Sequence, residues 1–123
     1  YNPEAPPAQQ FRTPVHCADM SKDRLVYVCD RVNDRIQVFR KDGSFVREFI
    51  VAPDTLGSGS VWDLDFLPDA TQSVLLAADG SNNTVWLLDR AGGALAARGA
   101  TARRRAGARP GRPGRRTGPH CPR

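Results

Sequence analysis

Two stretches of the chain carry the same residue pattern at an offset of 49 positions, and this repeat restricts the fold more than any other feature. Three polar or glycine positions recur at that offset, and apolar segments recur with them. The pairs are Asp30 and Asp79, Asn33 and Asn82, and Gly43 and Gly92, with apolar segments 25–29 and 74–78, and 36–39 and 85–88. Upstream the offset falls to 46, because the second copy has about three additional residues near 68–73. A fixed period of this length is typical of repeat architectures.

Each copy contains four short apolar segments separated by turn residues. Asp-Gly, Gly-Gly and Asn-rich sequences between the segments favour tight turns, and no stretch of ten residues has the period of a helix. The predicted strands are 14–19, 25–30, 35–40 and 45–49, then 61–66, 74–78, 84–89 and 94–97. Four antiparallel strands in every ~40–50 residues are typical of a β-propeller blade. We therefore predict an all-β partial β-propeller with about two four-stranded antiparallel blades.

Charge divides the 123-residue chain into two different parts. All 13 acidic residues lie in 1–90 beside 9 basic ones, which gives that part a net charge of −4, whereas 91–123 holds 9 Arg and no acid, for a total of +5. Ala, Gly, Arg and Pro make up 28 of the last 33 residues, so this tail has too little apolar surface to form a core. We expect 98–123 to be disordered. A tail without Lys, built from residues with GC-rich codons, favours an out-of-frame segment; the alternative is a genuine basic arm that attracts phosphates.

Recurring polar residues surround the predicted turn between the second and third strands of each copy. Asp30 ends a strand and is suited to capping the backbone amides that follow, and Asn33 suits a turn with left-handed conformations. Arg35 opens the next strand, where it can pair with Asp30 or with a neighbouring blade. Asp79 and Asn82 hold the same positions in the second copy. We assign all five residues a structural role.

The first copy closely resembles the NHL repeat over LVYVCDRVNDRIQVF at 25–39 and the Asp42-Gly43 pair that follows. The second copy keeps Asp79, Asn82 and the later glycine, but has Thr84 where the repeat usually has Arg. The resemblance covers roughly 11–97, and because NHL propellers usually have six blades, it implies that this chain is a fragment. The implied organisation is a lead-in at 1–10, NHL-like blades at 11–50 and 61–97, an inter-blade loop at 51–60 and the tail at 98–123.

Candidates for a ligand site lie on the first predicted strand of each copy. His16 is placed there in the first copy, and Trp62 and Asp63 in the second, where a propeller would direct them toward its central channel. The chain is similar in this respect to the NHL-like propeller of peptidyl-hydroxyglycine amidating lyases, whose inner-strand histidines hold zinc. That resemblance implies His16 as a metal ligand, with zinc or calcium as the ion in a complete propeller. The alternatives are an ordinary hydrogen-bonded His16 and a satisfied strand-edge Asp63, while Trp86 suits packing between blades.

Three cysteines are present, and no CxxC spacing occurs. Cys17 and Cys29 are expected on neighbouring strands, where we favour two buried thiols over a disulfide. Cys121 lies in the tail. This usage leaves the compartment open, with an extracytoplasmic location as one option, and no apolar run is long enough for a membrane span.

The sequence favours a binding function over catalysis. It contains no phosphate-binding loop, nucleophile elbow or assignable Ser/His/Asp set. We expect a binding or scaffold module that recognises a protein, peptide or polysaccharide on a propeller face, completed by further blades of the same chain or by other copies. The alternative is a fragment of a zinc-dependent lyase. A third hypothesis, nucleic-acid binding, involves only the Arg-rich tail.

Overall fold

Each half of the described chain forms one antiparallel sheet. The computed structural model describes residues 10–92 and 95–100, which contain eight strands and one short 3-10 turn, η2 (Arg31–Asn33). The first sheet comprises β1 (Cys17–Met20), β2 (Val26–Asp30), β3 (Arg35–Phe39) and β4 (Phe45–Ile50). The second comprises β5 (Asp63–Phe66), β6 (Val74–Asp79), β7 (Thr84–Asp89) and β8 (Leu95–Ala100). Neighbours along the chain pair in both sheets.

The predicted all-β class is confirmed, and the strands form at the predicted places. No strand end differs from its prediction by more than three residues. The largest differences are at β1, which begins at Cys17 instead of residue 14, and at β8, which continues to Ala100 instead of ending at 97. Residues 98–100 are therefore part of a sheet, and the prediction that disorder begins at 98 was wrong for them. The rest of the predicted tail, 101–123, lies outside the described residues. The part of the chain that the structure describes contains no helix long and apolar enough to cross a membrane.

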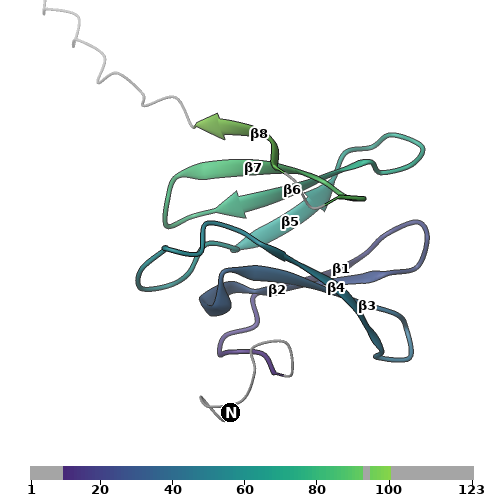
Figure 1. Ribbon diagram of the computed structural model, residues 1–123, viewed down its shortest axis with the longest axis horizontal. Coiled ribbons are helices and arrows are strands. Elements are labelled where there is room, and N and C mark those ends of the chain that lie inside the picture. The colour runs from purple at the N-terminus through teal and green to yellow at the C-terminus, as the bar shows by residue number, and fades with distance from the viewer. Residues whose placement is uncertain (1–9, 93–94, 101–123) are drawn as a thin grey trace, which may run out of the picture.

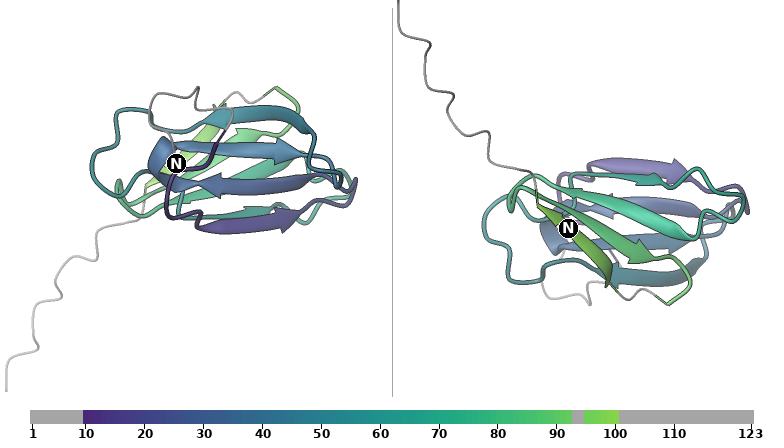
Figure 2. Two further views of the ribbon diagram at one scale, coloured as in Figure 1. Left: turned by 90° about the horizontal axis from the view of Figure 1, so that it is seen from below. Right: turned by 90° about the horizontal axis from the view of Figure 1, so that it is seen from above.

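The two sheets lie face to face (Figure 1). Figure 2 shows the first sheet in front in the left view and the second in front in the right view. Backbone contact between the sheets is concentrated at β1 and β5, the first strand of each sheet. The two sheets thus approach most closely along corresponding strands.

One hydrophobic core fills the space between the sheets. Because side chains alternate between the two faces of a strand, β2 and β3 direct every second residue toward the second sheet. The first sheet contributes Tyr27, Cys29, Ile36, Val38 and Phe49, and the second contributes Leu64, Phe66, Leu75, Ala77 and Leu88. The rings of Tyr27 and Phe66 meet edge to face with centroids 5.0 Å apart. Burial of this alternate set is the main force that joins the sheets.

Residues 10–12 cover the outer face of the first sheet, on the side away from the second sheet (Figure 1). The Phe11 ring packs edge-on against Phe39 with centroids 5.7 Å apart, and the Arg12 amide donates to Asp30 Oδ1 at 3.0 Å. Gln10 contributes its carbonyl oxygen to Arg35 Nη2 at 2.6 Å. The end of the predicted lead-in is thus bound to the sheet, while residues 1–9 lie outside the described residues.

A left-handed residue shapes the turn between the second and third strands of each sheet. Asp34 has φ 54° and Asn83 has φ 50°, and the two positions are 49 apart, so the repeat extends to backbone conformation. The sequence argument placed this conformation one residue too early, at Asn33. Asn33 instead closes the 3-10 turn and contributes a side-chain hydrogen bond.

Candidate functional site

The recurring aspartate of the first sheet is the centre of a buried hydrogen-bond network. Asp30 is fully buried, and its Oδ2 accepts from Arg35 Nε at 2.6 Å and from Asn33 Nδ2 at 2.8 Å. Arg35 is also buried and reaches Glu48 Oε2 at 3.1 Å. Of the two pairings expected for Arg35, the one within its own sheet forms. The network satisfies a carboxylate that would otherwise be very unfavourable in the interior.

The second sheet holds its aspartate with different donors. Asp79 Oδ2 accepts from Asn82 Nδ2 at 2.7 Å and from the indole Nε1 of Trp86 at 2.9 Å, and the Asn82 amide donates to Oδ1 at 3.0 Å. Asp79 is 2% exposed. Both aspartates are therefore inaccessible to a ligand of any size, and their contacts fix the turns that follow β2 and β6.

The residues predicted to face a channel are partly brought together. The rings of His16 and Trp62 lie 5.8 Å apart, and His16 Nδ1 hydrogen-bonds the Trp62 carbonyl oxygen. Asp63 is exposed, and its Oδ1 accepts from the Leu64 amide at 3.0 Å, as expected of a strand-edge carboxylate. Within the described ranges, no group of three or more His, Cys, Asp or Glu side chains is arranged to hold a metal ion. The residues described here therefore do not fit the zinc or calcium site that the lyase resemblance implies.

The cysteine expectation was wrong in its preferred form. Cys17 and Cys29 face each other across β1 and β2 and form a disulfide, with Cα atoms 4.9 Å apart. Sequence spacing alone did not separate this arrangement from two neighbouring thiols. Asp63 and Ala78 form the corresponding cross-strand pair in the second sheet. The covalent link therefore belongs to the first sheet alone among the described residues.

A cleft lies where loops of the two sheets meet, at the end where β2 and β6 begin. We call it the junction cleft; its volume is about 310 Å³. Its walls include Asp23 and Tyr27 of the first sheet and Thr71, Ser73 and Arg90 of the second. Residues from both halves of the chain are thus required to form it.

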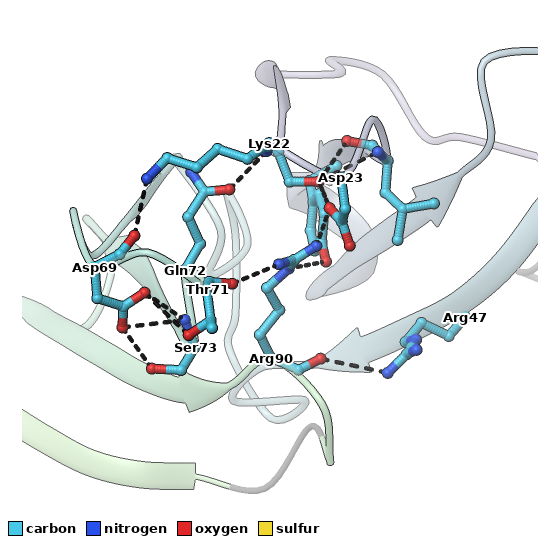
Figure 3. Close-up of polar contacts among 11 residues, drawn as sticks. Lys22, Asp23, Arg47, Asp69, Thr71, Gln72, Ser73 and Arg90 are labelled. Atoms are coloured by element: carbon cyan, nitrogen blue, oxygen red, sulfur yellow. Dashed lines mark hydrogen bonds and ion pairs between the residues drawn. The ribbon is translucent and has the colours of Figure 1, made fainter.

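Arg90 lines the junction cleft, and its polar contacts join the two sheets (Figure 3). Its Nε donates to the Tyr27 hydroxyl at 2.6 Å, its Nη1 donates to the Thr71 carbonyl at 3.0 Å, and its Nη2 pairs with Asp23. The guanidinium carbon also lies 5.5 Å from the centre of the Tyr27 ring. Burial acts to raise the pKa of Asp23, but hydrogen bonds from Ser21 and Arg90 outweigh it and hold the pKa below its usual value.

A loop with additional residues forms one wall of the junction cleft. Residues 67–73 connect β5 to β6 and include the approximately three residues by which the second copy exceeds the first. Lys22 of the first sheet binds this loop twice, through its amide to Gln72 Oε1 at 2.7 Å and through Nζ to the Asp69 carbonyl at 2.9 Å (Figure 3). The insertion was visible in the sequence, but its association with the first sheet was not.

Arg47 lies at the rim of the junction cleft, on the face of β4 that is turned toward the second sheet. Its Nη1 donates to the carbonyl oxygen of Ala91 at 2.7 Å and to that of Arg90 at 3.3 Å. Figure 3 shows the contact with Arg90. Its Nε and Nη2 have no partner among the residues that the structure describes, so they are available to an incoming acceptor. The cleft thus offers guanidinium donors beside the carboxylates of Asp23 and Asp89. Sequence reasoning missed Arg47 and Arg90, because neither lies in a recurring motif.

No protein-family model matches the chain, and no curated protein matches it.

Proposed function

We propose that the chain forms two consecutive blades of an NHL-type β-propeller and binds a polypeptide partner in the junction cleft. The observation that carries the proposal is that the sheets pack head to tail, which brings loops of both sheets together around the cleft. The repeat relates Tyr27 to Leu76 and Ile36 to Val85. Tyr27 and Ile36 lie in the core between the sheets, but their counterparts Leu76 and Val85 do not. The second sheet contributes its opposite face to that core, through residues such as Leu75.

Head-to-tail packing distinguishes this arrangement from a symmetric sandwich. Two equivalent sheets that close a sandwich bury equivalent faces, whereas consecutive blades bury opposite faces and can continue the series. The outer face of the second sheet carries Leu76 and Val85, which are half-buried and border a small hollow of about 100 Å³. A further blade in a propeller would pack on this face, as the second sheet packs on the first.

The chemistry of the junction cleft favours a polypeptide over a polysaccharide. An extended peptide presents alternating donors and acceptors with charged side chains, and the cleft presents Arg47 donors beside the Asp23 and Asp89 carboxylates. Sugars are commonly held on an exposed aromatic face. The aromatic residue that lines the described cleft is Tyr27, which is 1% exposed and lies beneath Arg90.

Selection from a displayed library of random peptides tests this function. Peptides enriched on the full chain are synthesised, and their affinities are measured by fluorescence anisotropy for the wild type and the Arg47→Glu variant. We expect Arg47→Glu to weaken binding at least tenfold, about 1.4 kcal/mol, because the rim guanidinium becomes a carboxylate. Arg40→Glu is the matched control, since it makes the same charge change in the turn after β3 and does not line the cleft.

The controls separate cleft binding from general attraction to a basic chain. The Arg-rich tail is identical in all three proteins, so its contribution cancels in the comparison. Equal losses in Arg47→Glu and Arg40→Glu would contradict the cleft as the binding site. Failure to enrich any peptide, or a glycan array in which Arg47 is required for sugar binding, would contradict a polypeptide ligand.

A further inference from the structure

Trp62 is held in a fixed position near the C-terminal end of β2, whereas the junction cleft lies at the N-terminal end of that strand. Its amide donates to the Ala78 carbonyl at 2.9 Å, and its indole Nε1 donates to the Gly59 carbonyl at 3.0 Å. A Cβ atom on Gly80 would lie 2.6 Å from the indole, so this glycine permits the close packing of the ring. Gly59, with φ 76°, lies directly against the Arg31 carbonyl, where any side chain would clash. Two glycines therefore bring the indole and η2 together.

Arg31 presents its guanidinium to this indole and forms no ion pair with the residues that the structure describes. The guanidinium carbon lies 5.0 Å from the centre of the Trp62 ring. Arg31 Nε is buried and has no hydrogen-bond partner, the sole such side-chain atom in the part of the chain that the structure describes. Its terminal nitrogens likewise have no acceptor among the described residues, but they are not buried. Buried polar groups without partners are rare in native proteins and call for an explanation.

His16 completes the surroundings of the indole. Its Nδ1 faces the Trp62 carbonyl, and since a carbonyl can only accept, that nitrogen carries the proton. Nε2 therefore points elsewhere, on an exposed side chain, without a partner among the described residues. In the neutral imidazole Nε2 then accepts hydrogen bonds, so of the two side chains that contact the indole only Arg31 offers donors to an anion.

We propose that Arg31, held against Trp62, forms an oxyanion-binding site that accepts a carboxylate or phosphate group. The terminal Arg31 nitrogens supply the planar pair of donors that such groups bind most strongly. Trp62 holds the guanidinium by a cation–π contact, which limits the rotamer freedom lost on binding. This site is independent of the junction cleft, because it lies at the other end of the strands and shares no residue with it.

An NMR titration with single anions tests the site. The chain contains two tryptophans. The indole N–H resonance of Trp62 reports on the site, and that of Trp86, whose indole N–H donates a hydrogen bond to Asp79, serves as an internal reference. Sodium phosphate, sodium acetate and sodium chloride are added at matched ionic strength. We expect phosphate, acetate or both to shift the Trp62 resonance with saturation, and chloride not to do so. A response to both phosphate and acetate identifies a general oxyanion site, whereas a response to only one of them shows whether the site prefers a phosphate or a carboxylate group.

Substitution of the cation distinguishes a site from general salt effects. We expect Arg31→Gln to weaken the saturable response at least tenfold and Arg40→Gln, a matched loss of charge elsewhere, to leave it unchanged. If Arg31→Gln does not fold, Arg31→Lys is the second variant, which keeps the charge but lacks the paired donors and should bind more weakly than the wild type. The proposal is overturned if no anion shifts Trp62, if chloride acts equally, or if the folded Arg31 variant responds as the wild type does.

Discussion

The two sheets bury an aspartate at the same place but neutralise it differently. In the first sheet Asp30 forms an ion pair with Arg35, whereas in the second sheet Asp79 accepts hydrogen bonds from Asn82 and the Trp86 indole. The position of Arg35 is occupied by Thr84 in the second sheet, and the donor arrives instead from two residues farther along β7. The repeat therefore conserves the acceptor and its burial between the two halves of this chain, while the donor can be charged or neutral.

The strongest test of this comparison removes the charged donor. We expect Arg35→Met to destabilise the protein by about 3–5 kcal/mol, because the Asp30 carboxylate stays buried without its cation. The free energy of unfolding is measured by urea denaturation. The matched variant Trp86→Phe removes one neutral donor from Asp79 and should cost about 1–2 kcal/mol. Equal losses would show that the charge of Arg35 has no special part in holding Asp30.

The second test concerns the covalent link that the second sheet lacks. Reduction of the Cys17–Cys29 disulfide should lower the free energy of unfolding by about 2–4 kcal/mol, because the unfolded chain gains freedom when its closed loop opens. Urea denaturation with and without dithiothreitol measures the change, and the Cys17→Ser/Cys29→Ser double variant should reproduce it. Cys121→Ser is the control, and a wild type insensitive to the reductant would contradict the expectation.

The smallest expected effect concerns Asp34, at the position where the second sheet has Asn83. Burial, aided by the charges of Asp79 and Asp54, raises the pKa of Asp34 despite hydrogen bonds from Ser60. A raised pKa means that the folded protein binds this proton more tightly than the unfolded chain does. Ionised Asp34 therefore lowers stability at neutral pH, and stability from this group increases as the pH falls through its folded pKa.

Asp34→Asn should raise the free energy of unfolding at pH 7 by about 0.5–1 kcal/mol. Asparagine is neutral, keeps an oxygen for the Ser60 amide, which donates to Asp34 Oδ1 at 2.8 Å, and tolerates the left-handed conformation. The repeat already places Asn83 at this position in the second sheet. Denaturation as a function of pH measures the gain, which should shrink at acid pH. Asp65→Asn, an exposed change on β5, is the control, and a loss of stability in Asp34→Asn at pH 7 would contradict the argument.

Much of the fold followed from local sequence. Short apolar segments between turn residues placed β2, β3, β6 and β7, and the spacing of the recurring aspartates placed the turns after β2 and β6. The errors have local causes as well. The left-handed residue was assigned to Asn33 because asparagine favours that conformation, but the geometry after η2 requires it at Asp34. The end of β8 was placed too early because its composition matches that of the tail.

The candidate sites were less accessible to sequence reasoning. The contact between His16 and Trp62 was anticipated only in that both were assigned to the first strand of a copy. Arg31 and Arg90 gave no signal, because an arginine beside a turn is usually a solvated residue. Their roles depend on which ring or acceptor the other sheet brings to them.

The sequence by itself determined the strands, their order and the turns marked by the recurring aspartates, because backbone preference and turn chemistry act over a few residues. Only the tertiary structure decided that the sheets pack head to tail, that Cys17 and Cys29 are joined, and that Arg90 reaches Tyr27 across 63 positions of the chain. These contacts join segments that are far apart in the sequence, so they depend on how the two sheets pack. The junction cleft and the Arg31 site both form from residues that this packing brings together.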